Sequence, residues 1–167
     1  MEKSSKEEFV FDTSALISLG SIKIIDDVLK IAEIIITPSV VKELQDFAKF
    51  NDAYGKASKE VLKYKTNFCI EQTHIKEDIT FIGKTDNELY NLGKQKSLTI
   101  ITDDIKFARH VNNKIDVQFS TFFLTALIEF GYLSKKKALN LLETLRDTRN
   151  WKNNIIYLTT KKILDNL

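Results

Sequence analysis

The sequence is poor in cysteine and in long apolar runs. Its single cysteine, Cys69, excludes an internal disulfide bond and a zinc site built from cysteines. No apolar run approaches the roughly 20 residues that span a bilayer, and no charged-then-apolar leader opens the chain. These absences predict an intracellular, cytoplasmic protein that does not interact with a membrane. The net charge is only +2, so a polyanion would need a local patch such as residues 135–137 or 161–162, each equally well a solvated helix face.

The chain is long and apolar enough to fold as one domain. It has 167 residues, of which 43% are hydrophobic, and this fits a common domain size with a sizeable core. No internal repeat or linker divides it. We expect a single domain over residues 1–167, in which residues 1–8 are loose and residues 120–167 form a helical C-terminal part.

Three apolar runs, of which the second is rich in β-branched residues, predict buried strands at residues 9–11, 32–37 and 97–102. Weaker patterns predict short strands at 68–70 and 115–119, strand or extended connection at 79–82, and extended chain at 151–158. Helical patterns occupy the first amphipathic segment, which ends near Val28, and then 39–47, 51–65, 85–93, 105–111 and two segments after Ser120 and Ser134. The alternation predicts a three-layer α/β/α fold with a central, mainly parallel sheet.

Helix ends are predicted from local signals. Ser14 or Thr13 should cap the first helix, and Thr37 the helix that opens with Pro38. Gly131 should end the helix after Ser120, and Ser134 should cap the next one. Thr85 followed by Glu88 matches a capping box, and Gly93 is a typical stop for that helix.

Acidic side chains follow the strands at several points. Asp12 comes directly after the first strand, and Asp103 and Asp104 come after the third. Glu43 and Asp86 lie early in two of the helices. The carboxyl ends of parallel strands share one edge of the sheet, where ligands bind in open α/β folds.

Each acid alone also has a structural explanation, as a helix cap, a first-turn acid or a solvated residue. Two buried strands that both end in acids at the same edge make a metal site as plausible as these structural roles. Clustered carboxylates repel one another unless a cation neutralises them, and Mg²⁺ prefers such oxygen ligands.

Four segments together resemble the PIN-domain nucleases, in the family's order. Residues 9–17 (FVFDTSALI) resemble the opening motif, 38–43 (PSVVKE) the second, 85–89 (TDNEL) the third, and 100–104 (IITDD) the fourth. Residues 120–167 are similar to the C-terminal part of a group of prokaryotic members. The archaeal relatives with a zinc ribbon differ, because this chain has one cysteine.

The resemblance implies a Mg²⁺- or Mn²⁺-dependent ribonuclease that leaves a 5′-phosphate and a 3′-hydroxyl. The implied catalytic acids are Asp12, Glu43, Asp86 and Asp104. The implied metal ligands are Asp12, Asp86, Asp104 and Asp103, with Asp103 against Asp104 left open as the principal ligand. The implied supporting hydroxyls are Ser14 and Thr102. The candidate phosphate contacts are Lys84, Lys106 and Arg109, for which plain surface charge is the alternative.

The resemblance also implies partners. RNA is the expected substrate, preferably single-stranded or looped. Many compact members are VapC-like toxins blocked by a small antitoxin, others process or degrade RNA without one, and members often form homodimers.

Three other functions can be compared with this one. A non-catalytic PIN-like RNA-binding module would have lost acids, whereas all four places are filled here. A receiver domain needs an acidic pair after the first strand. A phosphatase of the haloacid dehalogenase type needs an aspartate where Ser14 stands.

Overall fold

A computed structural model describes residues 6–167. Its sheet contains five parallel strands in the order β3-β2-β1-β4-β5. The strands are β1 (Glu7–Phe11), β2 (Ala32–Ile36), β3 (Cys69–Ile70), β4 (Ile100–Ile101) and β5 (Val117–Gln118). The central strand pairs Phe9 with Ile34 on one side and Phe11 with Ile101 on the other. The predicted α/β fold with a parallel sheet is therefore confirmed.

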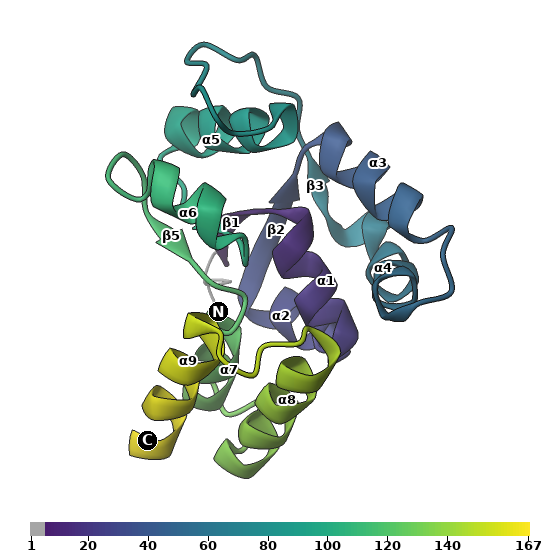
Figure 1. Cartoon of the computed structure of the whole chain (residues 1–167), viewed down its shortest axis with the longest axis vertical. Coiled ribbons are helices and arrows are strands. Elements are labelled where there is room, and N and C mark those ends of the chain that lie inside the picture. The colour runs from purple at the N-terminus through teal and green to yellow at the C-terminus, as the bar shows by residue number, and fades with distance from the viewer. Residues whose placement is uncertain (1–5) are drawn as a thin grey trace, which may run out of the picture.

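Helices surround this sheet, as Figure 1 shows. They are α1 (Thr13–Ser21), α2 (Ile25–Ile31), α3 (Pro38–Phe47), α4 (Ala53–Leu62), α5 (Lys84–Lys96), α6 (Ile105–Val111), α7 (Phe122–Glu129), α8 (Lys135–Thr148) and α9 (Ile155–Asn166), with a short 3₁₀ turn at Lys65–Asn67. The last three, coloured green to yellow, gather at the lower end of the molecule in Figure 1. No helix in the described part is both long and apolar enough to cross a membrane.

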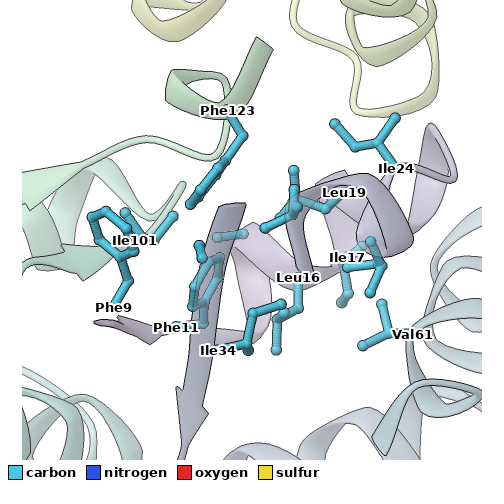
Figure 2. Packing of buried hydrophobic residues seen from close by; sticks show 14 of the residues in the cluster. Phe9, Phe11, Leu16, Ile17, Leu19, Ile24, Ile34, Val61, Ile101 and Phe123 are labelled. Carbon is cyan, nitrogen blue, oxygen red and sulfur yellow. The ribbon is translucent and has the colours of Figure 1, made fainter. Parts of the chain in front are cut away.

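The core forms around β1. Val10 and Phe11 are completely buried, as an apolar strand covered on both faces should be. The Phe11 ring stacks on Phe123 of α7 at 5.5 Å between centroids, and Phe9 meets the same ring edge-on at 5.6 Å. Figure 2 shows Phe123 between the strand and the C-terminal helices. The C-terminal helices thus pack against the strand that carries Asp12.

Several boundaries differ from the predictions near the two ends of the chain. Residues 7 and 8 belong to β1, so they are not loose, and residues 1–5 lie outside the described part. The first amphipathic segment is two helices, because the backbone turns at Lys23 with a positive φ of 56°. The extended segment predicted at 151–158 is wrong: α9 begins at Ile155, and the Asn154 side chain caps it by accepting from the Ile156 N–H at 2.7 Å.

The helix α5 differs from its prediction at both ends. It is capped at Gly83 and not at Thr85. Gly93 does not stop it, since the helix continues to Lys96 and ends at Ser97, which has a φ of 56°. Gly93 instead allows close packing, because a Cβ there would lie 2.7 Å from Cδ1 of Ile115. Residues 79–82 form a turn and not a strand.

Other predicted ends are confirmed. The Thr37 hydroxyl accepts from the Val40 N–H at the start of α3, and the Ser134 hydroxyl accepts from the Lys137 N–H at the start of α8. Gly131, predicted to end the helix before it, has a positive φ of 75° two residues after the end of α7.

Candidate active site

A pocket of about 220 Å³ lies where the carboxyl ends of the central strands meet the N-terminal turns of the following helices. Its lining residues are Asp12, Thr13, Ser14, Ile17, Glu43, Phe47, Tyr54, Asp86, Asp104 and Arg149. Four acids that the sequence singles out are therefore brought together. They come from segments up to 92 positions apart in the chain, because parallel strands deliver their C-termini to one edge.

Asp12 is the most deeply buried of these four acids, with 5% of its surface exposed. It occupies the N-cap position of α1, where neither its own side chain nor that of Thr13 or Ser14 makes the predicted cap bond. Its Oδ2 instead accepts hydrogen bonds from the hydroxyls of Ser14 and, at 2.7 Å, Thr102. Both predicted supporting hydroxyls thus contact Asp12.

The site holds more negative charge than it can easily accommodate. Burial raises the pKa of Asp12 from 3.8 to about 6, the two hydroxyls oppose this rise, and the charges of Asp86 and Glu43 add to it. Burial likewise raises the pKa of Asp86, assisted by the charges of Asp104 and Glu43. A bound cation would offset the repulsion between these carboxylates, which contributes to the raised pKa of both Asp12 and Asp86.

Glu43 connects three helices through both of its oxygens. The Thr13 hydroxyl donates to Oε2 and the Thr85 hydroxyl donates to Oε1, each at 2.6 Å. The hydroxyl of Thr85, predicted to cap α5, therefore binds Glu43 instead. These contacts connect α3 to the first turns of α1 and α5. Asp12 lies at the N-cap of α1, and Asp86 lies in the first turn of α5.

Asp86 and Asp104 each use one oxygen to support their own helix. Asp86 Oδ2 accepts from the Gly83 N–H at 3.3 Å. Asp104 Oδ1 accepts from the N–H groups of Lys106 and Phe107 at 2.8 and 3.0 Å, so this residue caps α6. Each carboxylate therefore has a defined position while its other oxygen remains unused.

Three carboxylate oxygens at the pocket have no hydrogen-bond partner among the described residues. They are Asp12 Oδ1, Asp86 Oδ1 and Asp104 Oδ2. No group of three or more acid, histidine or cysteine side chains in residues 6–167 is arranged to hold a metal ion as it stands. The three oxygens are nevertheless hard donors of the kind that Mg²⁺ binds, and Mg²⁺ keeps several waters and takes only a few carboxylates.

Asp103 lies apart from this set. Its Oδ1 accepts from the Ser120 N–H at 2.9 Å and its Oδ2 from the Ser120 hydroxyl at 2.7 Å. It does not line the pocket, whereas Asp104 does. The two neighbours therefore have different surroundings, and the geometry favours Asp104 over Asp103 as a metal ligand.

This difference predicts opposite effects for two substitutions. Asp103→Ala should cost about 1–3 kcal/mol of unfolding free energy, because it leaves the buried Ser120 N–H unpaired. Asp104→Asn should leave stability nearly unchanged, because asparagine caps helices as well as aspartate does. Urea denaturation of both variants, with Mn²⁺ titration of the folded proteins, checks this. Loss of metal binding in Asp103→Ala but not in Asp104→Asn would contradict the assignment.

The predicted phosphate contacts lie outside the pocket lining. Lys84, Lys106 and Arg109 are exposed, and of these Lys106 is near enough to Asp86 for its charge to oppose the rise in that residue's pKa. The cation that does line the pocket is Arg149, which the sequence analysis missed. It stands at the end of α8, and no local pattern links it to acids more than 40 positions away.

Comparison with known proteins adds a family. The PIN domain family model matches residues 8–165. No curated protein matches the sequence. One matching solved structure is a domain of a functionally unknown protein from Methanocaldococcus jannaschii, with 22% identity and a TM-score of 0.48 over 68% of this chain and 90% of that chain.

Proposed function

Because the chain belongs to the PIN domain family, we propose that it is a metal-dependent endoribonuclease acting at the pocket of Asp12, Asp86 and Asp104. The observation that carries this proposal is the set of three aspartates from separate segments, each with one oxygen left without a protein partner. A buried acid with a purely structural role would have both oxygens satisfied, as Asp103 does, whereas the buried Asp12 has only one.

The residues at the pocket are proposed to have different roles. Asp12, Asp86 and Asp104 would hold a Mg²⁺ or Mn²⁺ ion, which when bound supplies an activated water and charge stabilisation. Ser14 and Thr102 fix the orientation of Asp12 through its Oδ2, so that Oδ1 keeps a constant place. Glu43 holds the helix starts together through Thr13 and Thr85. Such prepositioning lowers the cost of reaching the reactive geometry.

The substrate is proposed to be single-stranded or looped RNA, because an unpaired backbone can enter a pocket at the edge of a sheet. The biological role is proposed to be that of a toxin restrained by an antitoxin, with RNA processing as the alternative. Expression in a bacterial host separates them: a toxin arrests growth, and Asp12→Asn relieves the arrest. An RNA-processing enzyme lets the host grow normally.

Cleavage of RNA should require both the divalent ion and Asp86. Asp86→Asn keeps an oxygen that can accept from the Gly83 N–H but removes a charge, so the helix should form while cleavage falls at least about 100-fold. Labelled RNAs of mixed sequence, incubated with Mg²⁺, Mn²⁺ or EDTA and separated on denaturing gels, measure this.

Asp116→Asn is the matched control, since Asp116 does not line the pocket. Equal cleavage by wild type and Asp86→Asn, or cleavage that continues in EDTA, would overturn the proposal.

A further inference from the structure

Among the described residues that line the acidic pocket, Arg149 is the sole cation. It follows the last turn of α8, in the C-terminal part of the chain, and its N–H bonds to the Leu145 carbonyl at 2.9 Å. The arginine therefore joins the four acids from a segment that follows all of them in the sequence. The Arg149 guanidinium forms no ion pair with the four acids of the pocket among the described residues. Its role is therefore not simply to neutralise their charge.

The aromatic neighbours of Arg149 hold its guanidinium in place. The guanidinium carbon lies 4.8 Å from the centroid of the Tyr54 ring and 5.8 Å from that of Trp151. Tyr54 belongs to α4 and also lines the pocket. Stacking on aromatic faces restrains a planar guanidinium without using its N–H donors.

Those donors are left without partners. Arg149 Nε and Nη1 are buried and have no hydrogen bond among the described residues. A buried donor without a partner costs about 1–3 kcal/mol. By contrast, Arg146, one turn earlier, pairs with Glu143 and Asp147. The fold therefore keeps Arg149 unpaired at the place where four acids could have neutralised it.

An anion that enters the pocket would meet the guanidinium of Arg149, which lines it. The guanidinium fork matches two oxygens of a phosphate, and charge-assisted bonds of this kind are among the strongest in proteins. A nucleic-acid phosphate drawn to a cation at Asp12, Asp86 and Asp104 would reach the same pocket. We propose that Arg149 is the phosphate-binding residue of this site and contacts a backbone phosphate of the RNA; this rests on the proposed function.

A structural role is the alternative. The positive charge of Arg149 is one of several influences that oppose the rise in the pKa of the buried Asp103. If Arg149 served only the fold, its replacement would lower stability and leave the electrostatics of RNA binding unchanged. The two roles therefore differ in a measurable quantity, the salt dependence of binding.

The test uses a fluorescein-labelled single-stranded RNA of mixed sequence, about 12 nucleotides long. Its binding to the full chain is followed by anisotropy in Ca²⁺ and in EDTA, between 50 and 300 mM KCl. For Arg149→Gln we expect weaker binding and a slope of log Kd against log salt that is smaller by about 0.7, the value for one phosphate contact on a single strand. Arg149→Lys should restore the slope.

Arg146→Gln is the matched control, because it removes one charge from the last turn of α8 outside the pocket, and its slope should equal that of the wild type. An unchanged slope in Arg149→Gln overturns the proposal, while RNA cleavage by the wild type still supports the nuclease. Loss of slope without any metal-dependent cleavage supports Arg149 and overturns the nuclease instead.

Thermal melting accompanies each measurement. If Arg149→Gln does not fold, Arg149→Lys decides by its kcat/KM for cleavage. Loss of the fork should lower kcat/KM at least about 10-fold with little change in Tm. A value equal to that of the wild type would overturn the proposal.

Discussion

The Asp12→Asn variant is expected to lose RNA cleavage by at least about 100-fold and, without metal, to be more stable than the wild type. The loss of cleavage follows from removing the charge of the most buried acid at the pocket. The gain in stability follows from the cost of keeping that charge buried when no cation is bound. Both effects have the same origin, because a buried carboxylate that would bind a metal carries an uncompensated charge when the metal is absent.

The raised pKa of Asp12 predicts how its effect on stability changes with pH. The folded-state pKa of Asp12 is about 6 and its ordinary value is 3.8. A raised pKa favours folding below the ordinary value, and this contribution is lost as the pH rises through about 6. At pH 7.5 the ionised Asp12 therefore lowers stability, by about 3 kcal/mol at most when the shift is converted. Asparagine avoids this cost because it carries no charge.

Melting temperatures in EDTA at pH 7.5 and pH 4 check the prediction. The advantage of Asp12→Asn should be largest at pH 7.5 and should shrink at pH 4, where the wild-type carboxyl is largely protonated. Adding Mn²⁺ at pH 7.5 should stabilise the wild type more than the variant. Asp165→Asn, an exposed change on α9, serves as the control. A variant that melts below the wild type in EDTA at pH 7.5 would contradict this account.

The sequence predicted what depends on short stretches of chain. The run before Asp12 predicts a buried strand because its apolar residues are contiguous, and the strand then delivers the acid to the sheet edge. Thr37 and Pro38 predict the start of α3 for the same local reason. The resemblance to the PIN-domain family implied which four acids belong to one site, and the family itself is shown by the match over residues 8–165.

Contacts between distant segments could not be predicted in this way. Thr85 looks like a cap because Glu88 follows at the right spacing, yet its hydroxyl binds Glu43, 42 positions earlier. Gly93 looks like a stop, yet it makes room for Ile115. The divergence of Asp103 from Asp104 depends on Ser120, and the place of Arg149 depends on how α8 meets α4. Each outcome is decided by packing, for which one sequence carries no local signal.

Phe123→Ala is expected to cost about 3–5 kcal/mol of unfolding free energy, the range for removing a large buried ring. Phe123 is 1% exposed and its ring meets those of Phe9 and Phe11 at 5.6 and 5.5 Å. It thus joins the C-terminal helices to the strand that ends at Asp12. If residues 120–167 belong to the same domain as the sheet, the loss should destabilise the whole chain at once.

Urea unfolding can follow both parts of the chain separately. The single tryptophan, Trp151, reports on the C-terminal part by fluorescence, and far-ultraviolet circular dichroism reports on the helices of the whole chain. Both curves should shift together to lower urea and remain superimposable, as for a two-state unit. Phe130→Ala, which changes a ring that is 65% exposed just after α7, should cost no more than about 0.5 kcal/mol. Two separate transitions, or a Phe123→Ala cost as small as that of Phe130→Ala, would show that the C-terminal helices fold independently of the strand that carries Asp12.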